Sequence, residues 1–196
     1  VLIDAVNDYG GTLTMYLSIG APDNATVQAW RAQGHEFGMH PFITNPDPYP
    51  PYNVENLPQG YTVANNWFTS TFSSPKSRTT RVHDLGGWGW TDNADLAMPY
   101  GIKFITHLFT EGAWLQRPDG TWPHGYIDGS GQPMRMVRED GTILDYFRQS
   151  LSLVDVQLLG TCFPGPENLN NAQALAVSRD LIDRSQTGDY AAIMSF

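Results

Sequence analysis

The sequence predicts an α/β domain built from parallel β/α units, with an added β-hairpin. Helix-like and strand-like stretches alternate over residues 1–42 with connections of only a few residues, which is typical of parallel β/α units. A second alternation follows over residues 79–109, and Asp140-Gly141 between two apolar stretches is a strong hairpin signal. A chain of 196 residues can bury one sizeable core, so its length suggests one domain, or two at most, and we expect a single domain.

Composition narrows the classes of partner. The net charge of −9 argues against nucleic acid and anionic membrane surfaces, because phosphate binding needs a basic footprint. No apolar run approaches the length of a membrane span, and the chain lacks the charged-then-apolar start of a signal peptide, so extracellular and cytoplasmic locations both stay open. The one cysteine, Cys162, excludes an internal disulfide and a thiolate metal cluster. The sequence gives no indication of oligomeric state.

The first β/α units can be followed residue by residue. Residues 1–9 favour a helix closed by two glycines, and residues 12–19 alternate as a strand with its apolar positions on one side. Asp23 or Asn24 can cap a helix that runs through Arg31. The order helix, strand, helix therefore leads directly into a second strand.

That second strand, residues 34–42, is the stretch with the clearest functional pattern. Its odd-numbered positions are apolar from Phe37 onward, whereas Glu36 and His40 fall on the opposite face. Pro41 has no amide hydrogen to donate, so the regular ladder stops there. His40 is consequently expected at the carboxyl end of a strand, where α/β folds place their sites.

The rest of the chain continues the same alternation after a long loop rich in proline. The further elements expected are a short helix at 61–72, a strand at 79–85, a helix at 93–98, a strand at 102–109, a hairpin at 134–147, a helix at 170–185 and a strand at 190–196.

Three histidines, His40, His83 and His107, lie near the carboxyl ends of successive expected strands. In a barrel these ends converge, so ligands that are far apart in sequence can meet at one ion. His35 begins its strand and is expected to be structural or exposed. His124 lies in a loop rich in Trp and Tyr, where it can contact a substrate or simply be solvated.

Arg81 shares a strand face with His83, and a guanidinium that points into a barrel must be paired. A catalytic carboxylate and a purely structural ion pair would satisfy it equally well. Trp88, Trp90 and Trp122 offer flat apolar faces suited to stacking on sugar rings, although core packing explains most Trp residues as readily. The sequence contains no nucleophile elbow, phosphate loop or activated cysteine.

These residues resemble a known family. Gly34-His35-Glu36-Phe37-Gly38-Met39-His40 resembles the Gly-His-Glu-Ile-Gly-Asn-His segment of polysaccharide deacetylases of the carbohydrate esterase family four type. Thr80-Arg81-Val82-His83 with Gly87-Trp88, then Tyr100-Gly101-Ile102-Lys103, then residues 129–135, continue the order of a divergent branch of that superfamily. The resemblance spans nearly the whole chain. It implies a partial, distorted (β/α)7 barrel with parallel strands and an added β-hairpin.

In that family a divalent metal, usually zinc, is held by one aspartate and two histidines, and metal-bound water attacks an acetyl carbonyl. The resemblance implies that His40 is the first metal histidine. The second would fall at Thr44, and we expect His83 to replace it. Arg81 is then the expected catalytic arginine, and Asp84, or alternatively Asp145, the stand-in carboxylate. The residues expected to bind substrate are Trp88, Trp90, His107, Trp122 and His124.

The leading expectation is thus a metal-dependent carbohydrate deacetylase-like hydrolase, acting on acyl groups of amino sugars or glycans. The paired aspartates of the family should precede residue 1 and its late histidine should follow Phe196. We therefore expect residues 1–196 to be one barrel domain truncated at both ends, and inactive alone. Two alternatives stay open: a catalytically inactive carbohydrate-binding module on the same barrel, and a glycoside hydrolase fragment that uses two carboxylates.

Overall fold

The fold is described from a computed structural model. It describes residues 2–18, 21–41, 56–82, 91–109, 118–120, 132–151, 153–154, 158–159, 168–188 and 194–195. The chain divides into two compact units, the first formed by Val1–Ile105 with Arg135–Phe147 and the second by Thr106–Met134 with Arg148–Phe196. Among the helices in the described ranges, none is both long and apolar enough to cross a membrane.

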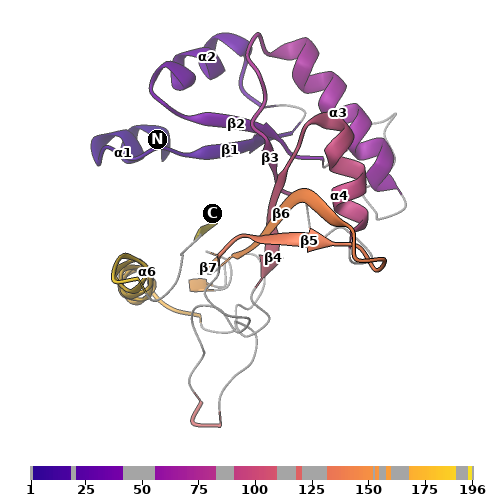
Figure 1. Cartoon of the computed structure of the whole chain (residues 1–196). Helices are drawn as coiled ribbons and strands as arrows, with labels where there is room; N and C mark the ends of the chain where they lie inside the picture. Colours follow the sequence, from indigo (N-terminus) through magenta and orange to yellow (C-terminus); the bar gives the residue numbers. More distant parts are fainter. Residues whose placement is uncertain are drawn as a thin grey trace. The chain divides into compact units, whose positions relative to one another are not determined.

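The first unit begins with the alternation that the sequence predicts. Its first elements are α1 (Leu2–Asp8), β1 (Thr14–Leu17), α2 (Asn24–Ala32), β2 (Glu36–Met39) and α3 (Leu57–Thr71) (Figure 1). The predicted helix at 61–72 thus begins earlier, because a proline lies in the first turn of α3, where its missing amide hydrogen costs nothing. Helix α2 is capped as expected, since the Asp23 carboxylate accepts the amide hydrogen of Thr26 at 2.8 Å.

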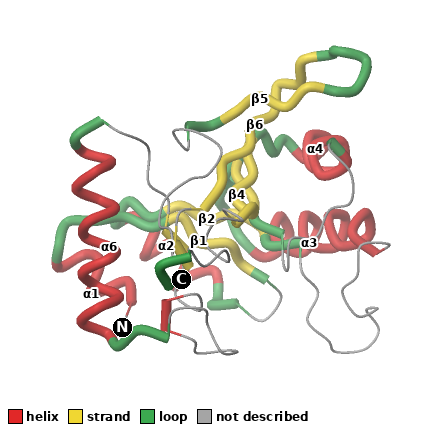
Figure 2. The backbone as a smooth tube through the Cα atoms, turned by 90° about the horizontal axis from the view of Figure 1, so that it is seen from below, coloured by secondary structure: helices red, strands yellow, loops and turns green. Residues whose placement is uncertain are grey.

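The alternation continues with β3 (Thr79–Thr80), α4 (Asp92–Ala97), the 3-10 helix η3 (Met98–Tyr100) and β4 (Phe104–Phe109). Helices α3 and α4 lie next to each other (Figure 2), and the Tyr61 hydroxyl of α3 donates to Asn93 of α4 at 3.3 Å. The strand predicted at 79–85 is described only in its first part, because residues 83–85 lie outside the described ranges.

Neighbouring strands from β1 to β4 follow the order of the chain. Strands β1 and β2 are parallel with Tyr16 opposite Gly38, and β3 and β4 are parallel with Thr80 opposite Ile105. The backbone amide of Ser77 donates to the carbonyl of Phe37 at 2.7 Å and so joins the start of β3 to β2. The protein is therefore an α/β structure with mixed, mostly parallel sheets, as expected. The described residues contain no closed barrel.

The predicted hairpin is confirmed. Strands β5 (Met134–Val137) and β6 (Ile143–Leu151) are neighbours in the sheet order β3-β4-β6-β5. The Gly141 amide donates to the Arg138 carbonyl and the Arg138 amide to the Thr142 carbonyl, each at 2.9 Å. With Gly141 at a φ of 87°, this is a three-residue loop with a left-handed last position. The Arg138 side chain forms an ion pair with Asp95 of α4.

The core of the first unit lies between the apolar face of its strands and the helices. Trp30 of α2 stacks on Phe37 of β2 with ring centroids 6.3 Å apart. The hairpin contributes its inner face to the same cluster. The cluster includes Leu17, Val27, Phe37, Met39, Leu57, Tyr61, Phe68, Val82, Ile102, Ile105, Met136, Leu144 and Tyr146.

The second unit contains α6 (Asn171–Gln186) and the parallel pair β7 (Leu153–Val154) and β8 (Met194–Ser195). Helix α6 starts with a capping box, in which Asn170 and Gln173 each accept the other's backbone amide hydrogen at 3.0 Å. Its apolar side packs a small core of Leu158, Ala174 and Leu181. The predicted helix at 170–185 is thereby confirmed, as is part of the final strand.

Tyr146 is a fully buried residue of β6 whose hydroxyl has no hydrogen-bond partner among the described residues. Burial raises the pKa of this phenol, because the phenolate would lose its hydration. The residue therefore contributes to the core through its ring, while its hydroxyl carries an uncompensated desolvation cost.

Replacement of Gly141 tests the hairpin loop. Gly141→Ala should lower the free energy of unfolding by about 1 to 2 kcal/mol, because a Cβ disfavours the left-handed conformation. Gly141→Asn should lower it by less, since Asn adopts that conformation more readily. Chemical denaturation of both variants is the measurement. Equal losses for Ala and Asn would contradict the conformational explanation.

Replacement of Tyr146 tests its unpaired hydroxyl. Tyr146→Phe should raise the free energy of unfolding by about 1 kcal/mol, because it removes only the unsatisfied group. Above about pH 10 the unfolded tyrosine ionises while the folded one keeps its proton, so stability falls as the pH rises. This alkaline loss should be smaller in Tyr146→Phe than in the wild type. Denaturation at neutral and alkaline pH would measure both effects, and a destabilised variant at neutral pH would contradict them.

Candidate functional site

One face of strands β1, β2 and β3 is polar, whereas the opposite face packs on the helices. Alternation along each strand places polar or small residues on this side, as the sequence predicts for Glu36, Gly38 and His40. We call this side the polar face. Its members are Thr14, Tyr16, Glu36, Gly38, His40, Ser77, Thr79 and Arg81.

Side-chain hydrogen bonds on the polar face form a continuous series, in which each hydroxyl donates to the next group. The Tyr16 hydroxyl donates to Thr79 Oγ1 at 2.9 Å, and Ser77 Oγ donates to the Glu36 carboxylate at 3.4 Å. Thr79 and Ser77 are joined at 2.9 Å. Since a hydroxyl has one hydrogen and that of Ser77 goes to Glu36, Thr79 must be the donor to Ser77. This series of hydrogen bonds thus runs from the Tyr16 hydroxyl to the Glu36 carboxylate.

Gly38 allows three strands to come together on this face. A Cβ built on Gly38 would lie 2.9 Å from the Thr79 carbonyl oxygen and 2.9 Å from Cδ1 of Tyr16. The Tyr16 ring therefore passes over Gly38 on its way from β1 to β3. Only a residue without a side chain fits beneath the ring.

His40 lies directly after β2, at the carboxyl end of the strand, as predicted. Its backbone amide donates to the Leu17 carbonyl at 2.8 Å, and its Nδ1 lies 2.6 Å from the Arg81 carbonyl oxygen. A carbonyl only accepts, so Nδ1 carries the hydrogen, and in the neutral ring the lone pair is on Nε2. The Thr80 hydroxyl reinforces the same strand contact by donating to the Met39 carbonyl at 2.9 Å. Metal-binding histidines are oriented by this type of outer-shell bond.

The structure brings two of the predicted site residues together, His40 and Arg81, through the Arg81 carbonyl. His107 lies in β4, and only its backbone is described. Asp145 is exposed and forms an ion pair with Lys103. The other predicted site residues lie outside the described residues: His83, Asp84, Trp88, Trp90, Trp122 and His124.

Within the described part of the chain, no three or more His, Cys, Asp or Glu side chains are grouped so that they could hold a metal. Nδ1 of His40 is bonded to the Arg81 carbonyl, and the predicted partner of His40, His83, lies outside the described residues. The prediction of a metal site therefore rests on His40 and on the sequence around it.

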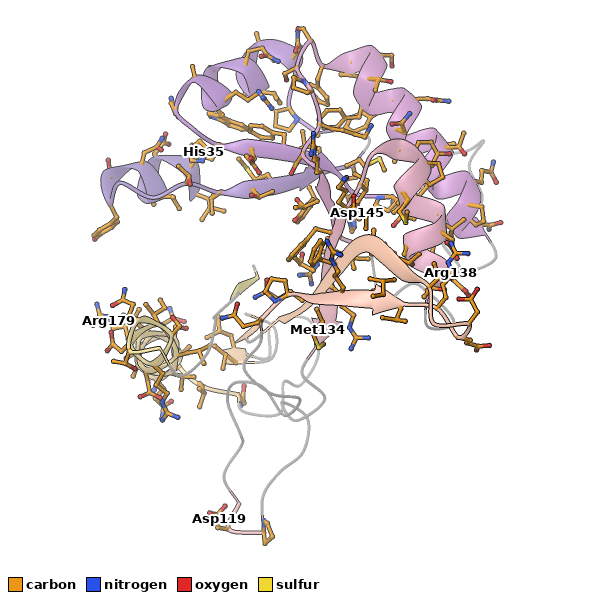
Figure 3. The ribbon with its side chains drawn as sticks, viewed as in Figure 1. His35, Asp119, Met134, Arg138, Asp145 and Arg179 are labelled. Carbon is orange, nitrogen blue, oxygen red and sulfur yellow. The ribbon has the colours of Figure 1, made fainter. Side chains whose placement is uncertain are left out.

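His35 has a structural role, in agreement with the sequence prediction. It is buried, with 3% of its surface exposed. Its Nδ1 accepts the backbone amide hydrogen of Leu13 at 3.0 Å, which fixes Nε2 as the donor to Asn7 at 3.0 Å. His35 thus connects α1 to the ends of β1 and β2 (Figure 3). Both of its nitrogens are occupied.

The sequence analysis did not identify Tyr16 and Thr79 as members of the polar face. The alternation of the first strand already places Tyr16 between apolar positions, and this was the available signal. Their contact across Gly38 depends on the register between strands, which alternation alone does not give.

Comparison of the chain with protein-family models, with curated proteins and with solved structures gave no match.

Replacement of Gly38 tests the geometry of the polar face. Gly38→Ala should lower the free energy of unfolding by about 1 to 3 kcal/mol, because the added methyl group overlaps the Thr79 carbonyl and the Tyr16 ring. Thr14→Ala is the matched control on the same face, since Thr14 is exposed and should change stability by less than about 0.5 kcal/mol. Thermal denaturation of both variants is the measurement. A Gly38→Ala protein as stable as the control would refute the close approach.

Proposed function

We propose that this chain is a metal-dependent carbohydrate deacetylase-like hydrolase, with His40 as a metal ligand. The observation that supports the proposal best is the bond between Nδ1 of His40 and the Arg81 carbonyl, at the carboxyl end of β2. It leaves the lone pair of the neutral ring on Nε2, the nitrogen that a divalent ion would bind. The family-like segment that ends in His40 supports the same role.

The proposed scaffold is a partial, distorted (β/α)7 barrel that spans residues 1–196. Strands β1 to β4 follow one another with a helix between each consecutive pair, and β1 with β2 and β3 with β4 are parallel, which supports this architecture. The polar face would then line the interior of the barrel. His40 and Arg81 would lie at its carboxyl-terminal end, where such folds carry out their chemistry.

Zinc bound at this site would activate a water molecule and polarise the acyl carbonyl of the substrate. His40 would hold the ion through Nε2, and the Arg81 carbonyl would keep the imidazole in the required tautomer and orientation. His83 is the proposed second ligand, with Arg81 and Asp84 as the proposed catalytic pair. Trp88, Trp90, His107, Trp122 and His124 are the proposed contacts to a carbohydrate.

Zinc binding by the full 196-residue chain tests the proposal. The protein is stripped with a chelator, dialysed against zinc, and analysed for bound metal by mass spectrometry and for affinity by competition with a zinc indicator. His40→Ala should weaken zinc binding by more than the roughly 10- to 100-fold that loss of an outer-shell partner causes. Thermal melting should verify that the variant is folded.

His35→Asn is the matched control, because both nitrogens of His35 are occupied in the structure. This variant should bind zinc as the wild type does. Equal zinc affinity of the wild type and His40→Ala would refute the proposed ligand. If the wild type bound glycan but no zinc, the inactive carbohydrate-binding module would replace the hydrolase as the best explanation.

A further inference from the structure

A second group of charged side chains lies at the amino ends of parallel strands, whereas His40 lies at the carboxyl end of its strand. Arg78 precedes the first residue of β3, and Lys103 precedes the first residue of β4, so both lie at the amino ends of these parallel strands. Their backbones are joined by a hydrogen bond of 2.8 Å from the Lys103 amide to the Arg78 carbonyl. His40, in contrast, follows the last residue of β2.

The hairpin brings a third cation to the same place. The Phe147 amide donates to the Lys103 carbonyl at 2.8 Å, which sets β6 beside the start of β4. The hydrogen bond between Arg138 and Thr142 sets the register of the hairpin. In this register Arg135 of β5 lies opposite Asp145 of β6. The Arg135 guanidinium lies over the Phe147 ring, 5.2 Å from its centroid.

The carboxylate of Asp145 lies among these three cations. Asp145 forms an ion pair with Lys103, and both side chains are about half exposed, at 57% and 45%. The side chains of Arg78 and Arg135 form no ion pair or hydrogen bond with any described residue, although both are exposed. On the neighbouring strand β2 the Glu36 carboxylate accepts hydrogen bonds from Ser77 and Thr14.

The electrostatics of Asp145 agree with this arrangement. The hydrogen bond and the charge of Lys103 lower the pKa of the Asp145 carboxyl, and Arg135 and Arg78 lower it further through their charges. The surface at this edge therefore has a local excess of positive charge, on a chain whose net charge is −9.

We propose that Arg78, Lys103 and Arg135 form a binding site for a small, doubly charged oxyanion, such as a phosphate or sulfate group. Guanidinium groups present paired donors that match the oxygens of such an anion, and two of them are available here. The strongly negative chain as a whole repels polyanions at longer range, so the site suits a small anion and not a nucleic acid. The site is independent of the proposed metal chemistry.

Titration of the full chain with inorganic phosphate, and separately with sulfate, tests this site. Backbone amide chemical shifts of the isotope-labelled protein are followed by NMR, against sodium chloride at matched ionic strength. We expect saturable shifts at Arg78, Lys103 and Asp145 with either oxyanion. Arg78→Gln and Arg135→Gln should each weaken binding by about tenfold. Asp145→Asn should strengthen it severalfold, because the anion no longer competes with a carboxylate for Lys103.

Arg184→Gln is the matched control, since Arg184 lies on α6 and is paired with Asp180. It should leave the affinity unchanged. The same shifts with sodium chloride alone would mean that salt only screens the pair of Lys103 and Asp145, and would overturn the site. Unchanged binding in Arg78→Gln and Arg135→Gln would also overturn it. All four positions are exposed, and circular dichroism verifies that each variant is folded.

Discussion

The arrangement of the site depends on the missing side chain at Gly38. Because nothing projects from this position, the Tyr16 ring can pass over β2 and its hydroxyl can reach Thr79 on β3. Three strands are therefore held by contacts on the polar face as well as by their backbones. The contact between β2 and β3 is completed by side chains, since Thr80 donates to the Met39 carbonyl and His40 to the Arg81 carbonyl. The orientation of His40 is a consequence of this local packing.

Much of this fold could be predicted from local signals in the sequence. Alternation with a period of two identified β1 and β2, Asp140-Gly141 identified the hairpin, and Pro41 explained why the strand ends beside His40. The helical period identified α6. The position of Leu57 as the first residue of α3 was missed, because its signal is a proline in the first turn and not an apolar period. Local sequence signals were thus sufficient to predict features that depend on a single helix, strand or turn.

Features that depend on register could not be predicted in this way. Tyr16 and Thr79 are far apart in the sequence, and their hydrogen bond follows from how β1, β2 and β3 are aligned. The same is true of Arg78, Lys103 and Asp145, which lie on or just before adjacent strands because β4 lies between β3 and β6 in the sheet. A one-residue shift of any strand would move these side chains to the opposite face. The sequence identified His40 as a candidate, and the structure added the carbonyl that orients it.

The direction of the hydrogen-bond chain on the polar face has a consequence for recognition. The Tyr16 hydroxyl donates its hydrogen to Thr79, and the series of hydrogen bonds ends on the Glu36 carboxylate, which accepts from Ser77. Tyr16 consequently presents a lone pair to whatever lies against it. A group that contacts this oxygen while the bond to Thr79 stays intact must supply the hydrogen itself, as a hydroxyl or amide group does. The bond to Thr79 therefore favours hydrogen-bond donors over acceptors at the Tyr16 oxygen.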